Sequence, residues 1–273
     1  MLHDTHCHMN IIMRNFLDDK KFVPFSDEEK KMLENIMQEA ADAGVEKIIN
    51  VGTNKAQSTA CTVIASYFQN CFSAIGIHPN DITSDWKSEI QYFQTLIDQD
   101  HNNKIIAIGE CGIDKHYPDY NLTLQEEVFH AQIQFALKNN KAIIVHSRDA
   151  DEETYKVLAA YKGAKNFRGT IHCFASNREY AAKYIDLGFV LGVGGTITYP
   201  KNEELRYVAN NINIDSIVLE TDAPFLSPQK VRGTKNKPAN IALIAEFIAQ
   251  LRNMPQHDFD KNVAANVQRV FGI

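Results

Sequence analysis

The chain has 273 residues, 44% of them hydrophobic and 23% charged, and its formal net charge is −6. This composition is typical of an ordinary globular protein, and the acidic balance argues against a protein that coats duplex nucleic acid through many basic side chains. No apolar run is long enough for a membrane helix, no signal peptide or flexible linker is evident, and the five cysteines contain no C-x-x-C pair. We therefore expect one domain over residues 1–273, in the cytoplasm, with no membrane association and no obligate protein partner.

Eight short segments rich in β-branched and apolar residues recur along the chain, and each is predicted to be a strand. They lie at 2–8, 46–52, 71–79, 104–114, 141–148, 167–174, 188–197 and 216–225. Near-continuous apolar strands are typical of a parallel sheet that is covered on its outer face.

Helical segments separate these strands. A Ser or Thr three residues before a Glu forms a potential capping box, which predicts helix starts at Ser26, Thr123 and Ser176. Gly44 and Gly188 are placed to end helices. Further helices are expected at 54–69, 84–101, 150–162, 201–211, 238–252 and 256–270.

Strands and helices that alternate in this way predict an α/β fold, a single (β/α)8 TIM barrel. The alternative is a doubly wound open sheet, which would carry a Gly-rich phosphate-binding turn after the first strand. This chain has His6 and His8 at that place. The glycines of "GVGGT" (192–196) lack the phosphate-binding spacing and are interpreted as sites of close backbone packing at the barrel mouth.

Polar residues of one chemical kind fall at the predicted carboxyl ends of the strands, the end at which barrel active sites form. They are His6, His8, His78, Glu110, His146, His172 and Asp222. Imidazole and carboxylate groups suit divalent first-row metals. Six of these residues, all except His78, are more ligands than one open catalytic ion normally takes from a protein.

Two divalent ions per chain fit this ligand count better than one. We predict that His6, His8 and Asp222 hold one ion and that His146 and His172 hold the other. Glu110 is predicted to bridge the two ions, because its strand lies between the two histidine groups in chain order. Zinc, manganese, magnesium, iron and nickel all remain open, since selectivity among them depends on geometry and supply.

The residues next to these ligands are given separate roles. Asp4 is predicted to fix a ligand imidazole through its free ring N–H. Cys7, Cys111 and Cys173 each neighbour a ligand, so strand alternation predicts that they face the helices. The segment 9–25 is expected to be a long first loop over the site.

Six stretches, taken in order, resemble the TatD family of metal-dependent deoxyribonucleases within the amidohydrolase-like barrels. They are "DTHCHM", "GIHPN", "IGECGID", "VHSRDA", "IHCF" and "VLETDAPF", the last followed by "RGTKNKPAN". The resemblance runs from residue 4 to about residue 240 and implies the same six ligands. It also implies hydrolysis of phosphodiester bonds in DNA, most naturally in single strands or at ends.

The expected mechanism is hydrolysis by a water that two metal ions activate. Asp222 would accept the proton of this water while it binds a metal, and Glu110 would act with it. His78, Arg148, Arg232 and Lys235 are the candidate substrate contacts. Two other functions remain open. One is a dinuclear-metal hydrolase of a carbonyl ester or amide, whether a small molecule or an aminoacyl-tRNA ester. The other is a non-catalytic metal-binding protein, against which the complete ligand set argues.

Overall fold

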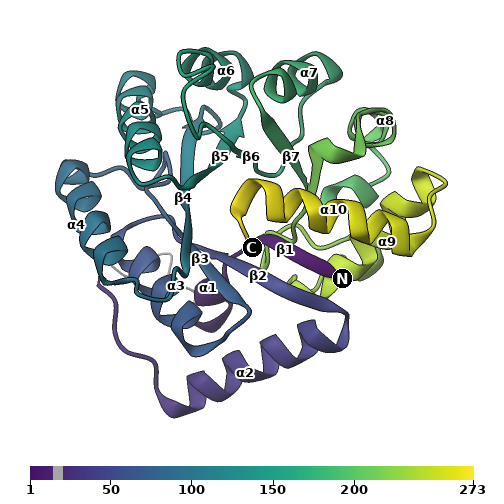
Figure 1. The fold of residues 1–273 in the computed structure, drawn as a ribbon, viewed down its shortest axis with the longest axis horizontal. Coiled ribbons are helices and arrows are strands. Elements are labelled where there is room, and N and C mark those ends of the chain that lie inside the picture. Colours follow the sequence, from purple (N-terminus) through teal and green to yellow (C-terminus); the bar gives the residue numbers. More distant parts are fainter. Residues whose placement is uncertain (15–20) are drawn as a thin grey trace.

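The computed structural model describes residues 1–14 and 21–273. Its centre is an eight-stranded sheet in which the strands stand in chain order and neighbouring strands run parallel, with the helices outside it (Figure 1). The strands are β1 (Leu2–Cys7), β2 (Val45–Val51), β3 (Cys71–Ile75), β4 (Ile105–Asp114), β5 (Ala142–Arg148), β6 (Gly169–Ile171), β7 (Phe189–Val193) and β8 (Ile217–Leu219).

The sheet closes into a barrel where β8 meets β1, and this seam holds one isolated bridge, backbone hydrogen bonds from His8 to Ala223 and from Asp222 to His6, and side-chain hydrogen bonds. Thr5 Oγ1 donates to the carbonyl oxygen of Leu219 at 2.9 Å. The carboxylate of Asp4 accepts from the backbone N–H of Thr221 at 2.9 Å and from its hydroxyl at 2.6 Å. The predicted (β/α)8 barrel is therefore confirmed.

Apart from α1, the helices that connect the strands lie where the sequence pattern predicts them, within a few residues. They are α1 (Met9–Arg14), α2 (Asp27–Asp42), α3 (Lys55–Tyr67), α4 (Trp86–Gln99), α5 (Leu122–Lys138), α6 (Asp151–Ala159), α7 (Arg178–Asp186), α8 (Glu203–Asn211), α9 (Ile241–Leu251) and α10 (Gln256–Phe271). Of the long first loop expected at 9–25, the first part is α1, and residues 15–20 lie outside the described residues. No described helix is long and apolar enough to cross a membrane.

One of the three predicted capping boxes is present, and two are wrong. Ser26 caps α2 together with Glu29, as expected. The helices α5 and α7 are capped instead by Asn121 and Asn177, whose side-chain oxygens accept from backbone N–H groups of the first turn. Asn is as good a cap as Ser or Thr, so each helix begins at the residue that best meets its free N–H groups.

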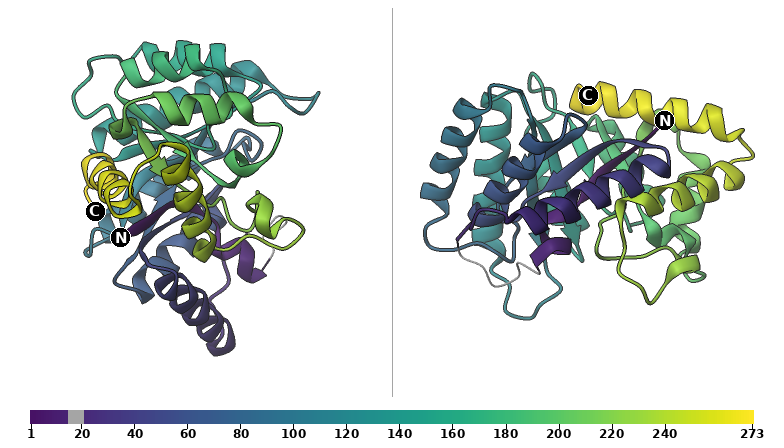
Figure 2. Two further views of the ribbon diagram at one scale, coloured as in Figure 1. Left: turned by 90° about the vertical axis from the view of Figure 1, so that its right-hand side faces the viewer. Right: turned by 90° about the horizontal axis from the view of Figure 1, so that it is seen from below.

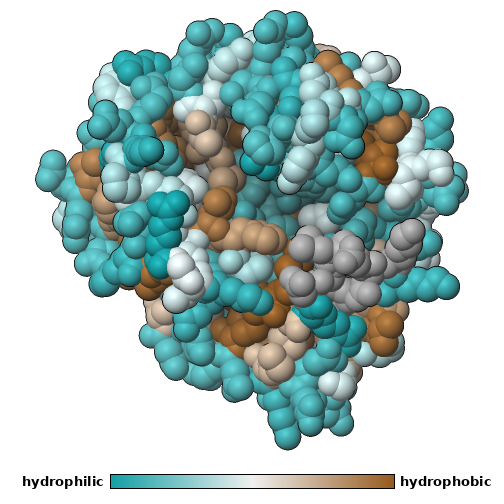
Figure 3. Space-filling view, turned by 180° about the vertical axis from the view of Figure 1, so that it is seen from behind, coloured by the Kyte–Doolittle hydropathy of each residue, from teal (hydrophilic) through white to brown (hydrophobic). Residues whose placement is uncertain are grey.

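Apolar side chains inside the barrel form their own cluster, which α10 closes at the amino-terminal end of the strands (Figures 1 and 2). Ile49 of β2 and Ile144 of β5 lie in this cluster with Val270 and Phe271 of α10. A second, larger cluster lies between the sheet and the surrounding helices. Because the interior is filled and one end is closed, the open end is the carboxyl end, whose surface is hollowed near its middle (Figure 3).

Candidate metal centre

Glu110, near the end of β4, stands between two groups of histidines at the carboxyl end of the barrel. Its Oε2 atom lies 3.4 Å from His6 Nε2 and 3.9 Å from His8 Nε2. Its Oε1 atom lies 2.8 Å from His146 Nδ1 and 3.9 Å from His172 Nε2. The two carboxylate oxygens thus lie near different histidines, and the rings of His6 and His172 also stack with their centres 3.5 Å apart.

Asp222 completes the group of six predicted ligands. Its Oδ1 atom lies 3.3 Å from His8 Nε2, 3.8 Å from His6 Nε2 and 3.7 Å from His172 Nε2. The strand β8 already ends at Leu219, and Asp222 follows it with a φ of 55°. This left-handed conformation is one that Asp adopts more readily than most residues. The backbone N–H of Asp222 donates to the carbonyl oxygen of His6 at 2.8 Å, which ties the segment to β1.

A buried asparagine supports the loop that carries Asp222. The side-chain amide of Asn236 donates to the carbonyl oxygens of Thr221 at 2.7 Å and Phe225 at 2.8 Å. Asn240 in turn donates to Asn236 Oδ1 at 2.8 Å. Asn236 and Asn240 both belong to the motif "RGTKNKPAN", so this motif contributes to the site by supporting the loop that carries Asp222.

Two carboxylates that the sequence analysis missed lie behind ligand histidines. Glu220 Oε1 lies 3.0 Å from His172 Nδ1, and Asp114 Oδ2 lies 3.1 Å from His146 Nε2. A carboxylate behind a ligand imidazole orients the ring and makes it a stronger donor. The available signal was position, since Glu220 stands two residues before Asp222 in "VLETDAPF" and Asp114 ends "IGECGID".

The predicted role of Asp4 is wrong. We expected its carboxylate to contact a ligand ring, but it is fully buried and accepts from Thr221 and from the backbone N–H of His6. Burial raises the pKa of Asp4 to about 7, against the hydrogen bonds that favour its charged form. Asp4 therefore helps to close the barrel seam and does not orient a ligand.

Gly192 leaves room for the side chain of Glu220, and Gly195 leaves room for the backbone of Leu226. A Cβ on Gly192 would lie 2.3 Å from Glu220 Oε2, and one on Gly195 would lie 2.3 Å from the carbonyl oxygen of Leu226. Both distances are too short for any side chain. The close packing expected of the "GVGGT" glycines is therefore present. At Gly192 it makes room for the buried carboxylate of Glu220.

The electrostatics of the cluster favour bound positive charge. Burial alone would raise the pKa of Glu110 and of Asp222, but the neighbouring imidazoles outweigh it and lower both values. For His172 the two effects are reversed. Burial by itself would lower the pKa of His172, but the carboxylates of Glu220 and Glu110 raise it to about 10. The carboxylates therefore remain ionised at neutral pH, and they raise the pKa of His8, His146 and His172, whereas burial still lowers the pKa of His6 and of His78.

The same atoms fit a divalent cation. The buried Nε2 atoms of His6 and His8 lie 3.1 Å apart and point to one place. Donor atoms of His6, His8 and Asp222 lie within 4.8 Å of one another, as do those of His6, Glu110 and His172. Among the described ion pairs, the partners of Glu110 and Asp222 are all histidines, so no lysine or arginine fills the cation's place.

The candidate substrate contacts differ in how close they lie to the cluster. His78 Nε2 is 3.8 Å from Glu110 Oε1, while its Nδ1 accepts from the backbone N–H of Asn80 at 3.1 Å. His78 thus faces the site and also caps the turn that follows it. Arg148, Arg232 and Lys235 are exposed, and the Arg232 guanidinium lies 4.5 Å from the centre of the Tyr199 ring. Because their side chains are exposed, these three cations are available to an approaching anion.

The cysteine predictions are confirmed for two residues and wrong for one. Cys7 and Cys111 are fully buried in the cluster between the sheet and the helices. The sulfur of Cys173 instead lies within 4.8 Å of a His172 nitrogen and a Glu220 oxygen. Because β6 ends at Ile171 and Cys173 has a φ of 46°, strand alternation no longer applies to it.

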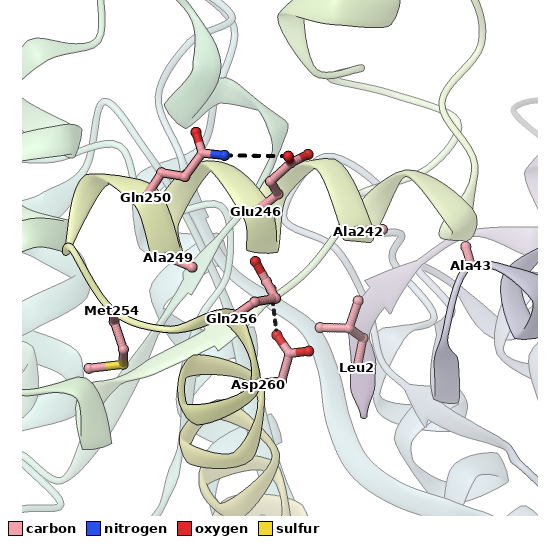
Figure 4. A pocket seen from close by; sticks show the side chains of 9 residues that line it. All are labelled: Leu2, Ala43, Ala242, Glu246, Ala249, Gln250, Met254, Gln256 and Asp260. Carbon is pink, nitrogen blue, oxygen red and sulfur yellow. Dashed lines mark hydrogen bonds between the residues drawn. The ribbon is translucent and has the colours of Figure 1, made fainter.

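A pocket of about 550 Å³ lies at the opposite, amino-terminal end of the barrel, beside β1, α9 and α10 (Figure 4). Its polar side chains bond to one another, Gln250 to Glu246 at 3.3 Å and Gln256 to Asp260 at 2.7 Å. Among the described residues, the groups able to hold a metal lie elsewhere, at the carboxyl end. The chemistry therefore points to the carboxyl end of the barrel and away from this pocket.

Comparisons with known proteins agree with this geometry. The model of the family described as TatD related DNase matches residues 3–272. An uncharacterized metal-dependent hydrolase of Bacillus subtilis, YabD, is 31% identical over 273 residues, which is the whole of both chains. The 3′-5′ ssDNA/RNA exonuclease TatD of Shigella flexneri is 30% identical over 88% of this chain and 93% of its own. The crystal structure of YjjV, a TatD homologue of Escherichia coli, superposes with a TM-score of 0.86 at 27% identity, covering 100% of this chain and 98% of that one.

Proposed function

The chain belongs to the TatD-related DNase family and is a metal-dependent hydrolase, and from this premise we propose that it is a nuclease that cleaves phosphodiester bonds of DNA with two divalent ions. The observation that carries the proposal is the position of Glu110, whose Oε2 atom lies near His6 and His8 while its Oε1 atom lies nearest His146. The name of the Shigella flexneri relative supports nucleic acid as the substrate, and a single strand as its form.

In this proposal each ion has its own protein ligands. His6, His8 and Asp222 would hold one ion, His146 and His172 would hold the other, and Glu110 would serve both. When bound, such a pair of ions supplies Lewis acidity toward a phosphoryl oxygen and makes a nucleophilic water available near neutral pH.

The chain's own groups orient the reaction. Asp222 is ionised, because the His8 hydrogen bond and nearby imidazoles lower its pKa despite its burial, so it can hold the attacking water and accept its proton. Glu220 and Asp114 fix the rings of His172 and His146. The exposed side chains of Arg148, Arg232 and Lys235, with His78, would bind the phosphates that flank the scissile bond.

The test uses protein stripped of metal and then loaded with one divalent metal at a time. A 3′-labelled single-stranded oligonucleotide, the same strand in a duplex, and a panel of carboxylic esters and amides are the substrates. We expect metal-dependent cleavage of the oligonucleotide, which His146→Ala and His6→Ala should each abolish or cripple.

Elemental analysis of the same samples separates loss of metal from loss of chemistry. Hydrolysis of the esters or amides without cleavage of any oligonucleotide would overturn the nuclease and favour the carbonyl hydrolase. If metal-loaded protein hydrolysed none of these substrates, the result would favour a non-catalytic metal-binding protein.

A further inference from the structure

Beside the metal centre lies a cavity of about 380 Å³ to which the proposed reaction gives no role. Two loops at the carboxyl end of the barrel form it, the turn after β3 and the segment between β4 and α5. Pro79, Ile82 and Leu124 supply apolar lining, and Tyr117 and Tyr120 stand at it with half-exposed rings. The two tyrosines are 51% and 42% exposed, so their rings are accessible to a molecule that enters the cavity.

One residue joins this cavity to the metal centre. Asn80 lines the cavity, and its side-chain amide donates to Asp114 Oδ2 at 3.0 Å. The same Asp114 oxygen lies 3.1 Å from His146 Nε2. The backbone N–H of Asn80 also donates to His78 Nδ1 at 3.1 Å. A group in the cavity would therefore lie next to the reacting centre, one side-chain layer away from a predicted metal ligand.

The charge of the lining selects the kind of group that fits. The described lining contains the carboxylate of Asp119 and no lysine or arginine, so it would repel a phosphate. Aromatic rings and apolar side chains with a few hydrogen-bonding groups suit a flat, neutral, partly polar ring. In nucleic acid, the nucleobase has this chemistry.

We propose that this cavity binds one unpaired nucleobase adjacent to the scissile phosphate, by stacking against Tyr117 and Tyr120. The inference rests on the proposed nuclease function for the link between base and bond cleavage. A base held in this way is out of a duplex stack, so the cavity makes the enzyme prefer single-stranded nucleic acid. Bases of any identity stack, and a strong sequence preference is therefore not expected.

The experiment compares Tyr117→Ala and Tyr120→Ala with Tyr117→Phe, which keeps the ring and loses the hydroxyl. Tyr67→Ala is the matched control, because Tyr67 is 41% exposed at the end of α3, away from the carboxyl end of the barrel. The first readout is kcat/KM for a single-stranded oligonucleotide and for the same strand in a duplex. The second is calorimetric binding of dAMP and of deoxyribose 5-phosphate to the metal-loaded protein, which needs no turnover.

We expect each Ala variant to lose roughly 5- to 100-fold in single-strand kcat/KM, the effect of one lost base–aromatic stack, with little change for the duplex. The advantage of dAMP over deoxyribose 5-phosphate should fall by a similar factor. The Phe variant and Tyr67→Ala should behave like the unaltered protein.

The two proposals fail in different ways. If Tyr117→Ala and Tyr120→Ala cleave single strands normally and bind dAMP normally, the base site is refuted and the nuclease stands. If the unaltered protein cleaves no nucleic acid but its preference for dAMP depends on the tyrosines, the nuclease is refuted and the base site stands.

Discussion

Replacing Gly192 by Ala tests whether Glu220 holds the ring of His172 in place. The added Cβ would lie 2.3 Å from Glu220 Oε2 and 2.8 Å from its Cδ, where ordinary contact needs at least 3.4 Å. The carboxylate would have to move by about 1 Å, because atoms cannot approach more closely. Since Glu220 Oε1 lies only 3.0 Å from His172 Nδ1, a shift of this size would break that contact.

Loss of such a partner behind a ligand typically weakens metal binding by roughly 10- to 100-fold, or about 1.4–2.7 kcal/mol. We therefore expect Gly192→Ala to raise the metal dissociation constant by this factor, measured by competition with a chromophoric chelator. Gly194→Ala is the control, because its Cβ would lie 3.4 Å from the nearest atom, the carbonyl oxygen of Glu220. Equal metal affinity in both variants and the unaltered protein, with both folded, would refute the role of Glu220.

For Asp222→Asn we expect turnover to fall by roughly 10²- to 10⁴-fold with the fold intact, the usual effect of a lost general base. Near-normal turnover would show that Asp222 does not accept the proton of the attacking water. Cys7→Ala should keep metal and activity at a cost of about 1 kcal/mol in unfolding free energy, whereas His6→Ala should lose metal by elemental analysis. Metal loss in both would contradict the assigned faces of β1. The hydrogen bond from Arg14 lowers the pKa of Glu29 to about 2 from 4.5, so this pair stabilises the fold above pH 4.5 and ceases to do so as the pH falls toward 2. The difference in urea unfolding between Glu29→Gln and the unaltered protein should shrink over that window, and a constant difference would exclude the pair as its cause.

The barrel and the ligand cluster could be predicted because both depend on regular, repeating rules. Strand alternation places His6 and His8 on one face, and parallel strands bring their carboxyl ends to one side. The separation of histidines around Glu110 follows from chain order, since neighbouring strands in this barrel are also neighbours in sequence.

The errors arose where a residue's partner lies far away in sequence. Asp4 contacts Thr221, more than 200 residues later, and no local pattern marks that contact. The positions of Glu220 and Asp114 within their motifs were the available signal, but the role of each carboxylate becomes evident only when the ring in front of it is placed. Cys173 was assigned to the wrong face because its strand ends at Ile171, three residues before the end of the predicted strand at 174.

Because predicted metal ligands stand on both sides of the seam between β1 and β8, metal binding has a consequence for folding. His6 and His8 stand on one side of this seam, and Asp222 stands just past the strand on the other. In the unfolded chain these donors are separated by a loop on the order of 200 residues, whose closure has an entropic cost. An ion held by all three would act as a reversible cross-link between the two ends of the barrel, and would stabilise the closed form in proportion to its affinity. A chain that had not yet brought its last strand to its first would lack the ion proposed for His6, His8 and Asp222, so an incompletely folded molecule would be inactive.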